Sequence, residues 1–448
     1  MPYAGTSLFR MLVTLTRGPL AAILAALAVL LSACAGRRPD ATAPALDVAA
    51  ESYVRLVLAL GERDADSLDS YHGPLAWQVE ARAQRAPLVD IQTAARSLAG
   101  SLASGTASGD EPRRMFLLRQ LRAVVTRIDI LRGRRPPFVE ELRALFGVDA
   151  GGEDDTAALS VRAELDGLLP GRGDLTARYA MFDRRFLIAP DRLGPVLARA
   201  IEGCRAATRA HVSLPAAERV DVEYVGDLPW SAFTRYQGGF RSRIQVNAAL
   251  PLTVDRALDL ACHEAYPGHH TIDSLLEARF GARRVEFLVQ PLFSPQSLLH
   301  EAASSLAGTL AFSESARVTF ERDQLFPLAG LDPAEADRHV RVGRLVDRLH
   351  GVHGDIARRY LDGVLDFPRA ALALQRDALV PSSPSADGTL KFLNRYRTYA
   401  ATYTIGRDAA SRYLDSRATG GDDASRWRAY IELVTDPAQI VPPEPARK

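Results

Sequence analysis

Apolar residues recur every three or four positions through most of the chain after residue 50. The segments 114–133 and 191–210 show the pattern clearly. Such spacing places apolar side chains along one face of an amphipathic helix, so both segments are predicted to be helical. Asp332, Pro333 and Glu335 are typical of a helix start that leads toward His350. Further helices are expected over 355–380, 389–414 and 424–435.

The predicted helices are separated by short segments rich in glycine, serine, aspartate and proline. These loops are expected at 104–112, 149–155, 381–388 and 418–423. The chain has 448 residues and is 47% hydrophobic, which is enough for a large core. The sequence therefore predicts a mainly α protein with one large helical domain over residues 51–448.

Two segments depart from the helical pattern just before residue 250. Residues 220–225 and 243–247 alternate and carry β-branched or aromatic side chains, so both are predicted to be strands. Gly238 and Gly239 lie between them. We expect a small antiparallel β element there. Its exposed edge could pair with an extended peptide, or the element could be a structural hairpin under the next helix.

The N-terminal residues have the pattern of an export signal. Arg10 and Arg17 precede a short apolar run that ends in Leu-Ser-Ala-Cys at residues 31–34. That ending resembles a bacterial lipobox, in which the cysteine becomes the lipidated first residue. We expect a signal peptide over 1–33, a lipid anchor on Cys34 and a tether over 34–50. The protein would be exported and membrane-anchored, facing the periplasm or the cell exterior; a plain membrane anchor is the alternative.

Charge and cysteine content narrow the functions further. A net charge of +1 predicts no broad attraction to nucleic acid. Apart from Cys34, the chain has two cysteines, Cys204 and Cys262. An exported protein could pair them, but two cysteines do not make a disulfide framework. For Cys262 we expect a buried structural residue rather than a metal ligand.

The stretch Cys-His-Glu-Ala-Tyr-Pro-Gly-His-His at residues 262–270 holds three of the nine histidines. It begins like the zinc-binding helix motif H-E-x-x-H, in which histidines four residues apart project side by side onto one ion. Here Pro267 occupies the position of the second histidine. In a straight helix, His269 would point about 120° away from His263, and His270 would lie about 10 Å further along.

A bend at Pro267 and Gly268 would resolve this geometry. Proline removes a helical donor and clashes with the preceding turn, and glycine tolerates unusual dihedral angles. Such a bend could bring a later histidine back beside His263. We therefore predict a Zn²⁺ site with His263 and His269 as ligands, and with His270 as the weaker choice for the second position.

The third protein ligand is expected on the next helix. Ser294 and Pro295 are typical of a helix start, and the helix that follows carries His300 and Glu301 among apolar and small residues. A glutamate on a second, downstream helix is the arrangement of zinc peptidases that bind the ion through two histidines and a glutamate. Glu301 is therefore the predicted third ligand, and His300 is the competing choice.

The chain here resembles the bacterial domain of unknown function 885 family, which is related to helical zinc peptidases. The resemblance rests on residues 263–270 and on Glu301, and more weakly on residues 70–74, 344–350 and 403–406. It implies a mostly helical fold with the metal site in a central cleft. Family members commonly have Gly-Trp-Ala after the downstream glutamate, where this chain has Ala-Ala-Ser at residues 302–304.

The expected function is a zinc-dependent peptidase acting on a peptide substrate. Zinc would lower the pKa of a bound water and polarise a carbonyl. Glu264 would take the proton of the water and pass it to the leaving amine. Tyr403 and His350, both in family-like segments, are the candidates that would stabilise the oxyanion.

Two questions stay open at this point. An arginine could bind a peptide carboxylate, and Arg241, Arg243 and Arg407 are equal candidates. The alternative function is a non-catalytic lipoprotein that binds metal or peptide and has lost turnover, because the residues after Glu301 differ from the family pattern. The presence of Glu264 favours the enzyme, since a purely structural zinc site needs no base beside its first histidine.

Overall fold

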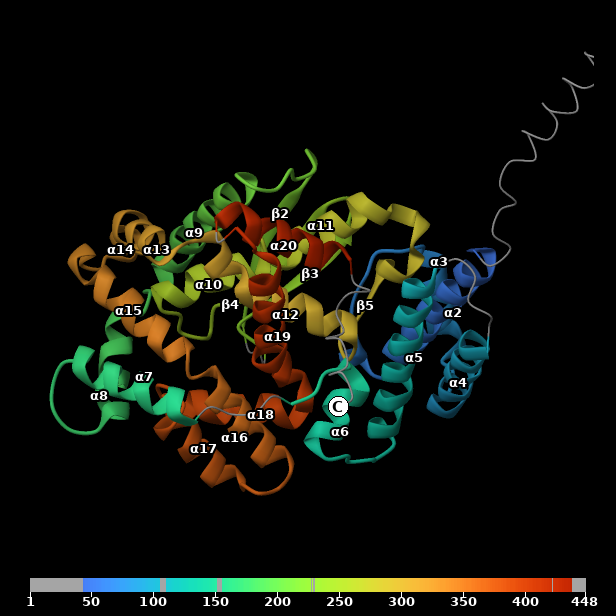
Figure 1. The fold of residues 1–448 in the computed structure, drawn as a ribbon, viewed down its shortest axis with the longest axis horizontal. Coiled ribbons are helices and arrows are strands. Elements are labelled where there is room, and N and C mark those ends of the chain that lie inside the picture. The colour runs from blue at the N-terminus through green and yellow to red at the C-terminus, as the bar shows by residue number, and fades with distance from the viewer. Residues whose placement is uncertain are drawn as a thin grey trace, which may run out of the picture.

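The computed structural model describes residues 43–104, 110–150, 155–226, 228, 230–420 and 422–436. The predicted signal peptide over 1–33 and the predicted lipidation site Cys34 lie outside the described residues. The described chain is mainly helical, as predicted, and also contains two small sheets (Figure 1). Within these described parts, no helix is both long and apolar enough to cross a bilayer.

Five helices that follow the N-terminus lie together at one end of the molecule. They are α2 (Ala43–Gly61), α3 (Leu75–Gln84), α4 (Leu88–Ser104), α5 (Glu111–Leu131) and α6 (Phe138–Phe146) (Figure 1). Tyr53, Leu58 and Leu117 are almost fully buried between α2 and its neighbours. Residues 43–50, which we assigned to the tether, belong to α2, and Leu46 and Ala50 are buried in the same core. The folded domain therefore includes residue 43 and does not begin at residue 51.

A three-stranded sheet lies beside the motif helix. Its strands are β2 (Arg219–Val225), β3 (Ala232–Gly238) and β4 (Arg241–Asn247), in the order β2-β4-β3. The two predicted strands, β2 and β4, run parallel, because the chain passes through β3 between them. β3 forms the antiparallel pair with β4. The β element is thus confirmed, but its antiparallel pairing involves a strand that the sequence analysis missed.

A second, two-stranded sheet joins distant parts of the chain. β1 (Leu68–Tyr71) pairs antiparallel with β5 (Val289–Pro291). The register shifts between Leu68 and Ser70, so that Asp69 is left out of the pairing. Like a β-bulge, this irregularity changes the direction of a side chain, here that of the unpaired Asp69.

The central helices carry the motif and its continuation. They are α7 (Asp155–Leu168), α8 (Leu175–Asp183), α9 (Leu193–Arg209), α10 (Val254–Glu264), α11 (His269–Phe280) and α12 (Pro295–Ala311). α10 packs against both α9 and α12. The predicted start of α12 is confirmed, because Ser294 Oγ accepts a hydrogen bond from Ser297 N at 3.1 Å. In Figure 1, α10 and α12 lie in the middle of the molecule.

The C-terminal part returns to α12. Its helices are α13 (Glu314–Phe320), α14 (Phe326–Ala329), α15 (Ala336–Asp347), α16 (His350–Leu361), α17 (Phe367–Arg376), α18 (Ser383–Tyr396), α19 (Ile405–Arg417) and α20 (Asp423–Thr435). The predicted helix 355–380 is two helices, because Gly363 follows α16 with a positive φ and Asp366 caps α17. The predicted helix 389–414 is interrupted by a 3-10 segment, Arg397–Tyr403. Much of the predicted loop 381–388 is the first part of α18, which Ser382 caps.

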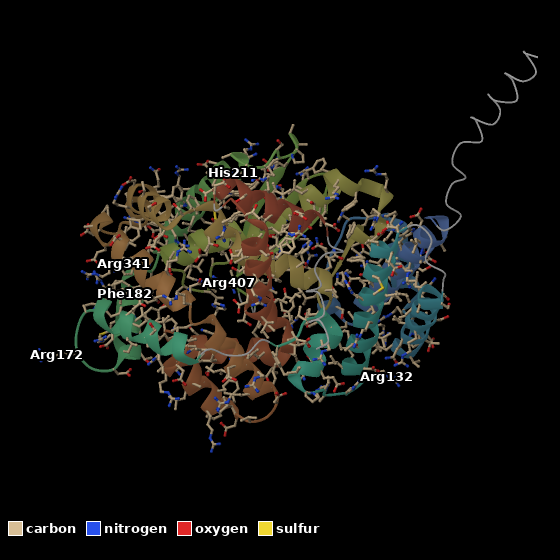
Figure 2. The ribbon with its side chains drawn as sticks, in the orientation of Figure 1. Arg132, Arg172, Phe182, His211, Arg341 and Arg407 are labelled. Atoms are coloured by element: carbon tan, nitrogen blue, oxygen red, sulfur yellow. A yellow bond between two sulfur atoms is a disulfide. The ribbon has the colours of Figure 1, made fainter. Side chains whose placement is uncertain are left out.

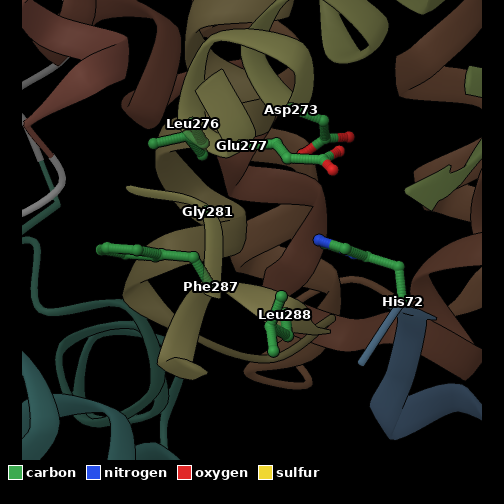
Figure 3. Close-up of a pocket in the computed structure, with 7 residues that line it drawn as sticks. All are labelled: His72, Asp273, Leu276, Glu277, Gly281, Phe287 and Leu288. Atoms are coloured by element: carbon green, nitrogen blue, oxygen red, sulfur yellow. The ribbon is translucent and has the colours of Figure 1, made fainter. Parts of the chain in front are cut away.

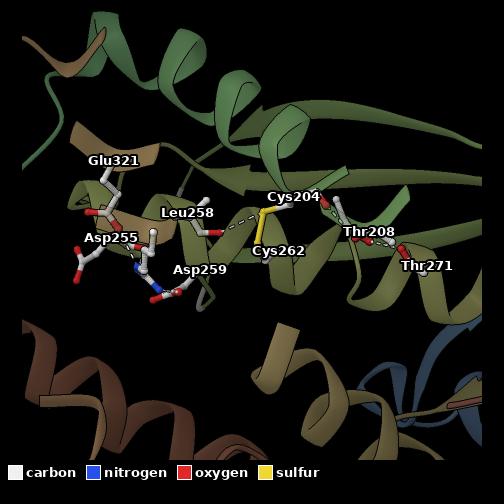
Figure 4. Close-up of a disulfide and its surroundings, with 10 residues drawn as sticks. Cys204, Thr208, Asp255, Leu258, Asp259, Cys262, Thr271 and Glu321 are labelled. Atoms are coloured by element: carbon white, nitrogen blue, oxygen red, sulfur yellow. Dashed lines mark hydrogen bonds and ion pairs between the residues drawn. A yellow bond between two sulfur atoms is a disulfide. The ribbon is translucent and has the colours of Figure 1, made fainter. Parts of the chain in front are cut away.

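A disulfide joins α9 to α10 (Figure 4). Cys204 and Cys262 are fully buried, and their Cα atoms are 5.4 Å apart. Cys262 is therefore buried, as expected, but it is paired, and its sulfur is not free to bind a metal. The pairing was left open by the sequence because 58 positions separate the two cysteines and only the packing of α9 on α10 brings them together.

Candidate metal centre

The backbone breaks between the two halves of the motif. α10 ends at Glu264, and α11 begins at His269. Between them the peptide bond before Pro267 is cis, and Gly268 N donates a hydrogen bond to the carbonyl oxygen of Cys262 at 3.0 Å. The predicted bend at Pro267 and Gly268 is therefore confirmed.

Gly268 lies where a side chain cannot fit. A Cβ atom there would meet the carbonyl oxygen of His263 at 1.8 Å. We expect Gly268→Ala to push α10 and α11 apart, to destabilise the protein by about 1–3 kcal/mol, and to weaken zinc binding. Chemical denaturation and a zinc titration measure the two effects. Gly388→Ala is the matched control, because a Cβ atom at Gly388 of α18 has open space around it; equal stability of both variants would contradict the prediction.

The three predicted ligands come together from three helices. His263 Nε2 lies 3.2 Å from His269 Nε2 and 3.3 Å from Glu301 Oε2. His269 Nε2 lies 3.5 Å from Glu301 Oε1. Ligand atoms about 2.0–2.1 Å from a tetrahedral zinc ion are themselves about 3.3 Å apart. In the described part of the chain, these side chains form the one group of histidine, cysteine and carboxylate residues close enough to hold an ion.

The electrostatics of the cluster favour a cation. Burial would raise the pKa of Glu301, but the charges of His269 and His263 outweigh this effect and hold the pKa well below its usual range. Burial would lower the pKa of His269, but Glu301 raises it to about 10. Glu301 Oε2 is buried, and no donor faces it in hydrogen-bonding geometry. A buried carboxylate oxygen without a donor is unfavourable, so the donor set fits a bound metal ion.

His270 points away from this cluster. Its Nδ1 lies 2.8 Å from Ser242 Oγ, and its Nε2 lies 3.2 Å from Glu218 Oε2. His270 is fully buried, and Glu218 also accepts a hydrogen bond from the hydroxyl of Tyr266 at 2.5 Å. Both ring nitrogens therefore have partners outside the cluster, and His269, not His270, is the histidine that lies beside His263 and Glu301.

Glu218 makes the fold sensitive to acid. Burial would raise its pKa, but hydrogen bonds with His270, Tyr266 and Arg205 outweigh burial and lower the pKa to about 2. A carboxylate with a lowered folded-state pKa contributes stability above its unfolded pKa of about 4.3, and this stability is lost as pH falls toward 2.

We therefore expect the difference in unfolding free energy between wild type and Glu218→Gln to shrink as pH drops from about 5 to about 3. Urea unfolding of the metal-free proteins measures this difference without interference from metal release. Glu223→Gln, at an exposed position of strand β2, is the control for loss of a carboxylate, and at pH 5 it should change the unfolding free energy less than Glu218→Gln does. A constant difference for Glu218→Gln across this pH range would contradict the prediction.

His300, the competing third ligand, faces another neighbour. Its Nδ1 lies 3.8 Å from Asp273 Oδ1, and its Nε2 is buried without a hydrogen-bond partner. Asp273 lines a small pocket together with His72 and Glu277, and Figure 3 shows these three polar side chains around it. His300 does not belong to the group of three ligands, so Glu301 fits the third position better.

Glu264, the predicted base, is held by strand β3. Thr234 Oγ1 lies 2.7 Å from Glu264 Oε2 and 2.9 Å from the carbonyl oxygen of Glu264. Both residues are buried. The Thr234 hydroxyl donates to Oε2 of Glu264, so Oε1 of the same carboxylate can accept from another group. Sequence reasoning did not find Thr234 because it did not predict β3.

Tyr403 lies beside the cluster, as expected for a candidate donor. Its ring centroid is 6.2 Å from that of His263 and 5.8 Å from that of Tyr399. Burial, with Glu301 nearby, raises the pKa of Tyr403 well above its usual range, so its hydroxyl keeps its proton. Tyr399 was not predicted, and its hydroxyl donates to Glu301 Oε1 at 2.6 Å. Both tyrosines lie in the 3-10 segment Arg397–Tyr403, where the four-residue spacing of an α-helix does not apply, so the spacing alone did not predict Tyr399.

The structure does not place His350 as an oxyanion donor. Its Nε2 lies 2.8 Å from Asp408 Oδ1, and its Nδ1 lies 2.8 Å from the carbonyl oxygen of Asp347. Both ring nitrogens therefore have partners outside the metal cluster. The imidazole links the start of α16 to α19, which is a structural role that the sequence did not indicate.

The three candidate arginines all face acidic partners. Arg407, labelled in Figure 2, binds Asp347, with Nη1 at 2.7 Å from Oδ1. Arg241 lies 3.5 Å from Asp221, and Arg243 lies 4.0 Å from Glu223. Nothing in these pairs singles out one arginine for a peptide carboxylate.

Asp69 is a further side chain near the centre, from the irregular position in β1. Its Oδ1 is buried and has no hydrogen-bond partner. Burial raises the pKa of Asp69 to about 7, with His269 opposing the shift and Glu301 adding to it. A carboxylate from the N-terminal part of the chain therefore lies within electrostatic reach of two ligands. The family-like segment 70–74 begins one residue after Asp69 and was the signal that could have pointed to it.

No known family profile matches this chain, and no curated protein matches it. One similar solved structure is described as a "putative lipoprotein" from Colwellia psychrerythraea, with 14% identity and a TM-score of 0.48; the match covers 78% of this chain and 65% of that one. Another is a "putative lipoprotein of unknown function" from Shewanella oneidensis, with 10% identity and a TM-score of 0.45, over 82% and 75% of the two chains. The resemblance to the domain of unknown function 885 family stays a prediction from the motif residues.

Proposed function

We propose that this protein is a zinc-dependent peptidase. One observation carries the proposal: His263, His269 and Glu301 are spaced like three ligands of a tetrahedral ion, and Glu264 is adjacent to the first of them. Three protein ligands leave a fourth position for water or substrate, which is typical of catalytic rather than structural zinc sites.

The side chains around the site have distinct roles in peptide hydrolysis. When bound, zinc would lower the pKa of a bound water and polarise the substrate carbonyl. Glu264 takes a proton from the attacking water through Oε1 and donates it to the amide nitrogen, so that the C–N bond breaks into a carboxylate and an amine. Thr234 keeps the Glu264 carboxylate oriented during both transfers. The protonated hydroxyl of Tyr403 donates to the carbonyl oxygen as negative charge develops there.

The proposal includes a lipid anchor on Cys34 and export from the cytoplasm. The basic residues and apolar run before Cys34 support this location. The buried disulfide between Cys204 and Cys262 supports it independently, because disulfides persist mainly in oxidising compartments. Peptides at the membrane surface, on its periplasmic or outer side, would be the substrates.

Digestion of a peptide mixture by the zinc-loaded mature protein tests the activity. We expect cleavage products in mass spectra, their loss after chelation and their return when zinc is added back. A second candidate is a non-catalytic metal- or peptide-binding lipoprotein. The low exposure of the ligand side chains favours it, because 19% for His263, 12% for His269 and 10% for Glu301 leave a substrate little access. Zinc retained without hydrolysis of any peptide would support this candidate and overturn the peptidase.

A further inference from the structure

We propose that Tyr399 makes Glu301 a one-oxygen ligand: Oε2 binds the metal, and Oε1 is reserved for the tyrosine hydroxyl. The inference rests on the metal site of the proposed function, and it gives Tyr399 the role of a positioning residue. It also predicts how the open fourth position of the site is maintained.

The two oxygens of Glu301 have different surroundings. Oε1 accepts a hydrogen bond of 2.6 Å from the Tyr399 hydroxyl, which is a length typical of a hydroxyl on a carboxylate. Oε2 has no donor in hydrogen-bonding geometry and lies 3.3 Å from His263 Nε2. Both residues are buried, with 5% of Tyr399 and 8% of Glu301 exposed, so water is a poor substitute for either partner. Each oxygen lies near one ligand histidine, since Oε1 is 3.5 Å from His269 Nε2, but Oε2 is the one that no hydrogen bond engages.

The packing around Tyr399 keeps its hydroxyl in place. Its ring lies among the rings of Phe146, Phe293 and Phe392, with centroids 6.2–6.5 Å away. Its carbonyl oxygen accepts a hydrogen bond from Thr402 Oγ1 at 2.7 Å. A ring enclosed by three others has few alternative rotamers. The hydroxyl is thus presented to one oxygen of Glu301 before any metal arrives.

One-oxygen ligation matters for the chemistry of the site. If both carboxylate oxygens of Glu301 bound the ion, the second would compete for the position that a catalytic site keeps open. Hydrogen bonds to the ligands of a metal orient them, and their removal typically weakens metal binding by about 10–100-fold. Tyr399 would do both: orient Glu301 and prevent it from binding through two oxygens.

The test compares Tyr399→Phe with Tyr396→Phe. The ring of Tyr396 lies 6.1 Å from that of Tyr399, and Tyr396 is not a hydrogen-bond partner of Glu301, so its variant loses a hydroxyl in the same neighbourhood. Competition with a chelator gives the zinc affinity of each full-length mature protein. We expect Tyr399→Phe to bind zinc about 10–100-fold more weakly than wild type and Tyr396→Phe to bind it as wild type does.

Visible spectra of the cobalt-substituted proteins give a second measurement, which reports the coordination number of the bound ion even if Tyr399→Phe is less stable than wild type. At saturating Co²⁺, the visible absorption weakens as the coordination number rises, so Tyr399→Phe should absorb less than wild type because Oε1 is free to bind. Unchanged zinc affinity and an unchanged cobalt spectrum would overturn the proposal, and so would equal losses in both variants. Because no step requires hydrolysis, zinc binding by a wild type that cleaves no peptide would refute the peptidase and leave this inference standing.

Discussion

Glu264→Gln is expected to lower the rate of peptide hydrolysis by about 10²–10⁴-fold while zinc stays bound. The amide has nearly the same shape as the carboxylate and can still accept the hydrogen bond from Thr234, so β3 and the ligand helices should remain in place. What is lost is the oxygen that takes the proton from water. Initial rates on a cleaved peptide, together with metal analysis, measure the two expectations separately.

Two results would contradict this role for Glu264. One is hydrolysis at the wild-type rate by Glu264→Gln, which would move the base elsewhere. The other is loss of zinc together with activity, which would make Glu264 a part of the metal site rather than the base. Glu314→Gln, an exposed glutamate in the first turn of α13, is the control and should leave both measurements unchanged.

His269→Ala is expected to lower the zinc affinity, whereas His270→Ala is expected to lower the stability of the fold. Removal of His269 takes away a proposed ligand, so the zinc affinity should fall by more than the roughly 10–100-fold that follows loss of a residue hydrogen-bonded to a ligand. Removal of His270 should leave the zinc affinity near that of wild type. It should instead destabilise the fold by about 1–3 kcal/mol, because Glu218 and Ser242 lose a buried partner.

Metal analysis and urea unfolding of the two variants check this pair of expectations. Zinc kept by His269→Ala would refute the ligand set. Zinc lost from His270→Ala without loss of stability would mean that the ring of His270 turns toward the ion when metal binds.

The local part of the site could be predicted from the sequence. Pro267 and Gly268 act on the backbone around them, so a bend between His263 and His269 followed from residue chemistry alone. The start of α12 followed from Ser294 and Pro295 for the same reason. The mainly helical fold could also be predicted locally, because the three- and four-residue spacing of apolar residues indicates a helix without reference to distant segments.

The choice between His269 and His270 needed the tertiary structure. The partners that hold His270 away are Ser242 on β4 and Glu218 before β2, and neither carries a sequence signal that points to the motif. Thr234 and Asp69 were missed for a related reason. Both lie on short strands whose pairing partners are set by packing rather than by local propensity.

Tyr399 and His350 also show what the sequence did not reveal: one residue at the cluster was missed, and one residue away from it was predicted. The two tyrosines 399 and 403 both reach the cluster because the chain turns in a 3-10 segment after α18, where a continuous helix had been expected. His350 came from a family-like segment, but its nitrogens are bound by Asp408 and the carbonyl of Asp347. Residue type and position alone do not tell which hydrogen-bonding groups are already engaged.

The centre draws on both ends of the chain. β1, which carries Asp69, pairs with β5 just before α12, and Tyr399 reaches Glu301 from the segment Arg397–Tyr403. A ribosome releases the chain from its N-terminus, so a nascent chain displays the two histidines and Glu301 well before Tyr399 emerges. The complete set of side chains around the proposed metal site therefore exists only after synthesis is nearly finished, and the proposed ion would be incorporated into the finished polypeptide.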